Sequence, residues 1–99
     1  MNDFVPIGTV VKLHENSNIK FMIVGYYPTN QDGESRDYAA IRYPMGVYDS
    51  RMYFFFNKED ISDVLHMGYI DDSYTSMIAL LKNALEKQKN KSEGGENNA

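Results

Sequence analysis

Two histidines and seven serines are the residues of this chain best suited to nucleophilic catalysis. His14 lies in a polar turn segment, and His66 lies in a segment with strand character. A catalytic serine needs a base within hydrogen-bond reach, and in the hydrolase elbow glycines frame it. No serine here has that glycine frame. We therefore interpret both histidines as structural and expect no catalytic site and no enzyme activity.

Carboxylates form two short clusters that could hold a divalent cation or cap helices. The first contains Glu59, Asp60 and Asp63, and the second contains Asp71 and Asp72. Calcium loops place several oxygen ligands at regular spacing around a fixed glycine, and neither cluster has that spacing. Acidic residues are favoured at helix starts, so we expect capping and no metal site. The scattered glycines match no phosphate-binding pattern, which predicts no cofactor.

Thirteen aromatic residues, eight of them tyrosine, remain as candidates for recognition. Four stand consecutively in R-M-Y-F-F-F-N, residues 51–57. Exposed rings can stack single-stranded bases, but such platforms lie in basic grooves. Residues 1–81 hold six Lys/Arg and eleven Asp/Glu, a net charge of −5. Tyrosine-rich acidic surfaces suit protein contacts better, so we expect a protein partner and no nucleic acid.

Composition indicates one small soluble domain. The chain has 99 residues, of which 42% are hydrophobic, and it contains no cysteine. A chain without cysteine fits a reducing compartment. The first residues lack the basic start and apolar run of a secretory signal, and no window has the ~20 apolar residues of a membrane span. We expect a cytoplasmic protein that does not enter the membrane.

Short β-strands are predicted over most of the chain. Residues rich in β-formers and separated by turn chemistry indicate four strands, and the short polar loop between the first two predicts a hairpin. These strands cover residues 7–13, 20–27, 37–43 and 51–56. Residues 29–36 are polar and read as an exposed loop, and Pro44 and Gly46 end the third strand.

A helical turn, a fifth strand and one helix complete the predicted elements. Asn57 is a good N-cap, and Asp60 can reach back toward it, which indicates one turn of helix. Residues 62–69 fit either a helix or a strand, and we favour a strand because Gly68 suits a helix interior poorly. A helix is predicted over residues 74–89, with an apolar stripe of Tyr74, Met77, Ile78, Leu81 and Leu85.

The predicted elements define a mainly β (α+β) fold. We expect a small five-stranded antiparallel SH3-like barrel or bent sheet with a C-terminal helix, with an open α+β sheet as the rival. The domain is predicted over residues 1–89, followed by a disordered polar tail at 90–99. In residues 51–56, one ring set should fill the barrel and the other should lie beneath the helix stripe. Function is then expected on tyrosines outside this strand: Tyr26, Tyr43, Tyr48 and Tyr69.

Three segments carry a resemblance to a known family: I-G-T-V-V-K-L (7–13), D-Y-A-A-I-R-Y-P-M-G (37–46) and Y-F-F-F-N-K-E-D-I-S-D-V-L-H-M-G-Y (53–69). They resemble domain of unknown function family 4176, small proteins of Gram-positive bacteria encoded in type VII secretion loci. The most specific element is the N-K-E-D-I stretch (57–61), an asparagine, two acids and an isoleucine with one lysine between, followed by Gly-Tyr. The family is defined without a known catalytic site, so the resemblance implies no catalytic residues in this chain.

The resemblance implies an accessory role beside LXG-type toxins and their small helical partners. A chaperone or adaptor that binds a toxin or secretion component is the function we expect. Two alternatives stay open at this point: an immunity protein for a toxin of the same locus, and an SH3-like nucleic-acid-binding module. Neither the 29–36 loop nor the polar tail can be given a family role.

Overall fold

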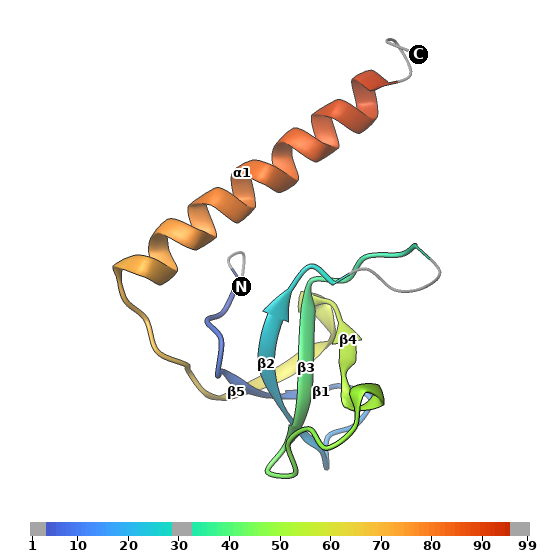
Figure 1. The fold of residues 1–99 in the computed structure, drawn as a ribbon. Helices are drawn as coiled ribbons and strands as arrows, with labels where there is room; N and C mark the ends of the chain where they lie inside the picture. Colours follow the sequence, from blue (N-terminus) through green and yellow to red (C-terminus); the bar gives the residue numbers. More distant parts are fainter. Residues whose placement is uncertain (1–3, 29–32, 96–99) are drawn as a thin grey trace. The chain divides into compact units, whose positions relative to one another are not determined.

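The computed structural model describes residues 4–28 and 33–95, with side chains described as far as residue 87. It divides into two compact units, Met1–Tyr69 and Ile70–Ala99, and each is described by itself. The first unit contains five strands and two 3₁₀ turns, and the second contains one helix (Figure 1). In chain order the elements are β1 (Val10–Leu13), β2 (Lys20–Tyr26), β3 (Tyr38–Tyr43), η1 (Ser50–Met52), β4 (Phe54–Phe56), η2 (Lys58–Asp60), β5 (Ile61–His66) and α1 (Asp72–Gly95).

The strands form one antiparallel sheet in the order β4-β3-β2-β1-β5. The predicted β1–β2 hairpin is confirmed, with Val11 opposite Phe21. Within the described residues, β4 pairs with β3 and β5 pairs with β1, so the sheet has two edges. The predicted fold of five antiparallel strands and a C-terminal helix is confirmed, and the sheet is open rather than closed into a barrel. Since β4 has only three residues, it offers little backbone for a closing ladder.

The core of the first unit lies on one face of this sheet. Val11, Ile23 and Ala40 are fully buried, and the rings of Phe21 and Phe56 lie 5.8 Å apart. The N-terminal segment at residues 4–6 is also buried. Burial of this apolar surface stabilises the unit by about 25 cal/mol for each Å² removed from water.

Two tyrosine hydroxyls fix the N-terminal segment to the sheet. The backbone N–H of Val5 donates to the Tyr38 hydroxyl at 3.0 Å, and the Tyr26 hydroxyl donates to the Val5 carbonyl at 2.5 Å. The Phe4 ring meets both tyrosine rings edge to face, and the Lys58 ammonium lies 4.1 Å from the centroid of the Phe4 ring. The two hydrogen bonds give the Val5 N–H and carbonyl partners in place of water. Without them, these buried backbone groups would be unpaired, which is destabilising.

The predicted strand at residues 51–56 is only partly correct. Ser50–Met52 is a 3₁₀ turn, and β4 begins at Phe54. The cause is Asp49, whose carboxylate accepts a 2.9 Å hydrogen bond from the Arg51 backbone N–H and caps the turn. A capped turn holds these residues in helical geometry, which outweighs the β-propensity of the adjacent aromatic residues.

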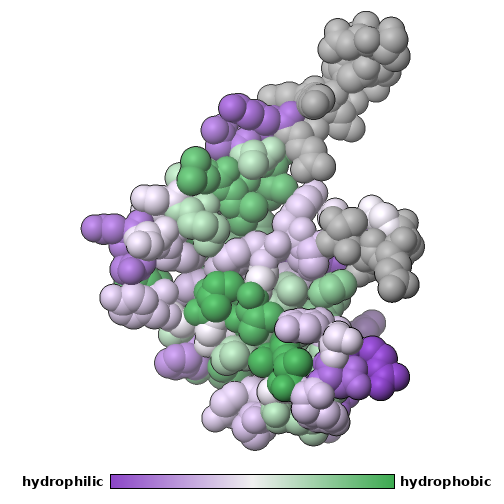
Figure 2. All heavy atoms as spheres, viewed as in Figure 1, coloured by the Kyte–Doolittle hydropathy of each residue, from purple (hydrophilic) through white to green (hydrophobic). Residues whose placement is uncertain are grey.

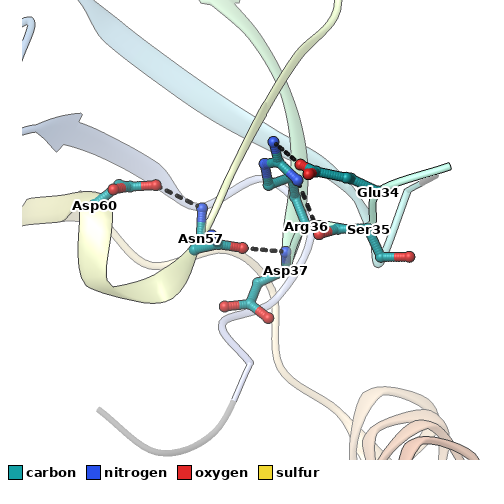
Figure 3. Close-up of polar contacts among 6 residues, drawn as sticks. All are labelled: Glu34, Ser35, Arg36, Asp37, Asn57 and Asp60. Atoms are coloured by element: carbon teal, nitrogen blue, oxygen red, sulfur yellow. Dashed lines mark hydrogen bonds and ion pairs between the residues drawn. The ribbon is translucent and has the colours of Figure 1, made fainter. Parts of the chain in front are cut away.

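The turn predicted at Asn57 is confirmed as η2, and a polar network fixes it (Figure 3). The Asp60 carboxylate accepts from the Asn57 backbone N–H at 2.9 Å. The Asn57 amide oxygen accepts from the Asp37 backbone N–H at 3.1 Å, and the Asp37 carboxylate accepts from the Lys58 backbone N–H at 2.8 Å. Asp37 and the Asn57 turn therefore brace each other, and they join the start of β3 to the end of β4.

Gly68 allows two backbone segments to meet after β5. A Cβ atom at this position would lie 2.1 Å from the Ile7 carbonyl oxygen, which is far inside contact distance. The Gly68 backbone N–H donates to the Thr9 hydroxyl at 3.0 Å, and Thr9 is fully buried. The predicted fifth strand is confirmed as Ile61–His66, and the glycine lies beyond its end.

Helix α1 is longer than predicted. It runs over Asp72–Gly95, and the Asp71 carboxylate accepts a 2.9 Å hydrogen bond from the Tyr74 backbone N–H, which is N-cap geometry. The helix includes residues 90–95, which lie in the predicted polar tail. Residues 96–99 lie outside the described part of the chain. The predicted packing of the helix stripe on residues 51–56 stays a prediction.

Candidate functional site

Six large apolar side chains are exposed between the end of β3 and the middle of β4. Their exposed fractions range from 38% to 75%. We call this set the β3–β4 surface; its members are Tyr43, Met45, Val47, Tyr48, Tyr53 and Phe55. Isolated exposed apolar residues are ordinary, but a concentration of them within 13 consecutive positions is typical of an interaction site. Figure 2 shows hydrophobic side chains interrupting the polar surface of the sheet unit.

The backbone that carries the β3–β4 surface is fixed at both ends. After β3, the Gly46 backbone N–H donates to the Arg42 carbonyl at 2.9 Å, and Gly46 has a φ of 75° that favours glycine. Before β4, the Asp49 carboxylate receives hydrogen bonds from the Arg51 backbone and guanidinium, the latter at 2.8 and 3.0 Å. These bonds, with the Arg51 side chain contributing most, hold the pKa of the Asp49 carboxyl below its usual range. The connection therefore presents its apolar side chains on a defined backbone.

An aromatic groove of about 260 Å³ lies on one side of the β1–β2 turn. Its apolar wall comes from β2 and β4, where the Phe21 and Phe54 rings meet edge to face at 5.3 Å. Its polar rim comes from His14, Glu15 and Asp60, and the His14 backbone N–H donates to the Asp60 carbonyl at 3.0 Å. A groove with a phenylalanine wall and an acidic rim can accept an apolar or basic side chain.

A second, basic pocket of about 300 Å³ is formed where the β1–β2 turn meets the end of β3. We call it the Lys20–Arg42 pocket; its lining is Asn18, Ile19, Lys20, Arg42, Tyr43, Pro44 and Met45. The Lys20 ammonium lies 6.0 Å from the Tyr43 ring centroid, and the Arg42 guanidinium lies 5.3 Å from that of Phe54. Tyr43 and Met45 belong to both the pocket and the β3–β4 surface.

A third cavity, of about 540 Å³, contains a serine hydroxyl that has structural partners. Lys58, Glu59, Ser62 and Asp63 line it with Tyr38 and two aliphatic residues. The Ser62 hydroxyl lies 3.2 Å from the Lys12 carbonyl oxygen and 3.1 Å from the Asp63 carboxylate, so acceptors for its proton are at hand. Among residues 4–28 and 33–95, no three metal-ligating side chains come together.

The four tyrosines predicted as interaction residues lie in different places. Tyr43 and Tyr48 are both exposed and belong to the β3–β4 surface. Tyr69 is 80% exposed and follows β5, next to the boundary with the second unit. Tyr26 uses its hydroxyl and ring to hold the N-terminal segment. Because Tyr26 pairs with Tyr38 and Tyr43 pairs with Lys20, Tyr26 and Tyr43 stand at opposite ends of the β2–β3 ladder.

Sequence reasoning did not single out several members of these surfaces. Met45 and Val47 lie beside Gly46 in a turn, and apolar residues in a turn were a usable signal of exposure. Lys20 and Arg42 gave no such signal, since they are 22 positions apart and reach the same end of the β2–β3 ladder only through its register, which sets Lys20 opposite Tyr43 and Arg42 opposite Phe21. A second apolar set, Val64, Leu65 and Met67, is exposed along and just after β5.

The fold and these surfaces define a small α+β protein with an open antiparallel sheet and exposed apolar edge segments. A family model described as domain of unknown function (DUF4176) matches residues 4–77, so the chain belongs to that family. The match covers the whole sheet and the start of α1. No curated protein and no solved structure matches the chain. Within the described residues, no helix combines the length and apolar character needed to cross a membrane.

Proposed function

We propose that this chain is a non-catalytic accessory protein that binds a polypeptide partner through the β3–β4 surface. The observation that carries the proposal is the set of six exposed apolar side chains on a backbone fixed by Gly46 and Asp49. Tyrosine, methionine and phenylalanine are enriched at protein interfaces because they combine large apolar area with, in tyrosine, a hydrogen-bonding group. A fixed backbone lowers the entropy lost when the partner binds.

The family resemblance supports a role for this binding in type VII secretion. We propose that the partner is an LXG-type toxin, or a secretion component from the same locus, and that the chain acts on it in the cytoplasm as a chaperone or adaptor. The motif that carries the resemblance does not compete with this surface, since Asn57, Asp60 and Gly68 serve local structure.

Charge favours a protein partner over nucleic acid. The formal net charge of the chain is −4 at pH 7. Non-specific nucleic-acid affinity comes from neutralising several phosphates at once. The Lys20–Arg42 pocket contributes only two cations, and the rim of the neighbouring aromatic groove is acidic.

Co-expression of the chain with the toxin of its locus, followed by purification and calorimetric titration, tests the proposal. Tyr48→Ser should weaken binding about 30-fold if Tyr48 is an interface hot spot worth ~2 kcal/mol. The control Leu80→Ser removes another exposed apolar side chain, 69% exposed on α1, and should bind as the unmodified chain does. Equal affinity for Tyr48→Ser and Leu80→Ser would contradict the proposal.

A second assay separates a chaperone from an immunity protein. Cells that express the toxin are compared with and without this chain. A chaperone or adaptor should raise the amount of soluble or exported toxin and leave toxin-treated cells unprotected. Protection of the cells would assign the complex to immunity instead.

A further inference from the structure

We infer that the aromatic groove is a second polypeptide-binding site and that it receives an arginine or lysine side chain. The site goes beyond the proposed function, because it opens on the other face of the sheet. Phe55 is shared by the groove lining and the β3–β4 surface, but along β4 its side chain alternates to the face opposite Phe54 and Phe56. The groove volume of about 260 Å³ accommodates one long side chain.

The apolar wall of the groove is built on a single face of the sheet. Ile23 follows Phe21 by two positions and stands opposite Ala40, and Ala40 stands opposite Phe54. Because opposed residues share a face, the Phe21 and Phe54 rings meet, with their centroids 5.3 Å apart. Phe21 is almost completely buried, whereas Phe54 is half-buried and offers ring surface to a ligand. The aliphatic stem of a long side chain can pack against this wall.

Two exposed carboxylates, Glu15 and Asp60, stand at the rim of the groove. The His14 backbone N–H donates to the Asp60 carbonyl at 3.0 Å, which joins the end of β1 to η2 and fixes the rim. Among the described residues, neither carboxylate forms an ion pair with a lysine or an arginine. Arg42 lies outside the groove lining, with its guanidinium 5.3 Å from the Phe54 ring centroid. The rim therefore keeps its negative charge for a ligand.

Wall and rim together favour a basic side chain over an apolar one. An apolar occupant would take water from the Glu15 and Asp60 carboxylates and supply no partner in return, which is unfavourable. A lysine or arginine side chain lays its stem on apolar surface and keeps its charged head at the polar edge, and aromatic rings attract such a cation. Residues 1–81 carry a net charge of −5, which attracts a basic segment and repels nucleic-acid phosphates.

Selection of phage-displayed random peptides on the full chain, with removal of phages that also bind Glu15→Lys, supplies the probe for a test. The most enriched peptide is resynthesised with a fluorescent label, and a neutral version carries citrulline for each arginine and norleucine for each lysine. Affinities of both versions are measured by fluorescence anisotropy. The proteins compared are the unmodified chain, Glu15→Lys, Tyr48→Ser and the control Glu86→Lys, which makes the same charge reversal at an exposed position of α1. Circular dichroism verifies that each variant is folded.

The enriched peptide should contain arginine or lysine. On the unmodified chain, Tyr48→Ser and Glu86→Lys, the neutral version should bind at least about fivefold more weakly, because it loses both the ion pair and the cation–π contact. On Glu15→Lys the basic version should bind no more tightly than the neutral one, because the substitution turns attraction at the rim into repulsion.

Four results would overturn the inference. The first is the enrichment of no peptide, or of one whose neutral version binds the unmodified chain equally well. The second is a neutral version that is weakened equally on Glu15→Lys and Glu86→Lys, which would indicate only general attraction to an acidic chain. The third is a loss on Tyr48→Ser as large as on Glu15→Lys, which would assign the peptide to the β3–β4 surface. The fourth is tighter binding of free spermidine than of the peptide, which would assign the groove to a polyamine. None of these results refutes the proposed function, which the titration of Tyr48→Ser with the toxin tests separately.

Discussion

Replacing Gly68 by alanine should be among the most damaging single-methyl changes in this chain. The added Cβ would lie 2.1 Å from the Ile7 carbonyl oxygen, 2.9 Å from the Ile7 carbonyl carbon and 3.0 Å from the Thr9 nitrogen. All three are backbone atoms, and they cannot swing aside as a side-chain tip can. Relief requires that the segment after β5 moves away from residues 7–9.

Residues 7–9, which Gly68 approaches, are held in place by hydrogen bonds to the sheet. The Gly8 backbone N–H donates to the Ile23 carbonyl at 2.9 Å, and the Ile23 N–H donates to the Thr9 carbonyl at 2.8 Å. Moving Gly68 outward instead breaks its 3.0 Å hydrogen bond to the buried Thr9 hydroxyl. Overpacking costs about 1–3 kcal/mol. The Gly68 N–H that loses its acceptor costs about 1–3 kcal/mol more, which gives roughly 2–6 kcal/mol in total.

Urea denaturation followed by far-ultraviolet circular dichroism measures this loss. Gly25→Ala is the matched control, because its Cβ would meet only the Ala39 Cβ at an ordinary 3.5 Å. The control should change the free energy of unfolding by less than about 1 kcal/mol. If Gly68→Ala is no more destabilising than Gly25→Ala, the close approach of residues 7–9 to Gly68 is not a feature of the folded protein.

Three further changes test other parts of the fold. Asn57→Ala removes the acceptor for the Asp37 N–H and should cost about 1–2 kcal/mol of unfolding free energy, measured by the same denaturation; a loss under about 0.3 kcal/mol would contradict the bracing role. Tyr38→Phe leaves the buried Val5 N–H without its acceptor and should speed hydrogen exchange of that amide, while an unchanged exchange rate would refute the contact. Because hydrogen bonds from Arg51 lower the pKa of Asp49, that pair supports the folded state at neutral pH, and the support is lost as the pH falls through the folded pKa. An NMR titration should give a higher Asp49 midpoint in Arg51→Met, and an identical midpoint would exclude the pair.

Local chemistry made much of the fold predictable. Asn57 with Asp60, and Asp71 before the helix, are capping signals that act within a few residues; the first was predicted from spacing, and Asp71 was one of the acidic residues expected to cap a helix. The β1–β2 hairpin followed from two β-rich runs and a short polar loop. By contrast, the Asp49 cap, which delays the start of the predicted strand to Phe54, was missed, since a run of aromatic residues gave a stronger local preference.

Features that depend on distant pairing were less predictable. Sheet closure depends on whether β4 and β5 meet, and no local pattern encodes the distance between two edges. The role of the half-buried Tyr26 depends on its contact with Val5, 21 positions away in the chain. The exposed apolar residues of the turn after β3 could have been predicted from the sequence, but the pairing of Lys20 with Tyr43 across β2 and β3 could not.

The most direct test of the central claim is NMR mapping of the partner on the isotopically labelled full chain. The account predicts that addition of the toxin from the same locus shifts or broadens backbone amide signals at residues 43–55. Signals from η2 and the Gly68 segment should change little, because those residues serve the fold. Perturbations confined to β5 or α1, with residues 43–55 unchanged, would contradict the assignment of binding to the β3–β4 surface.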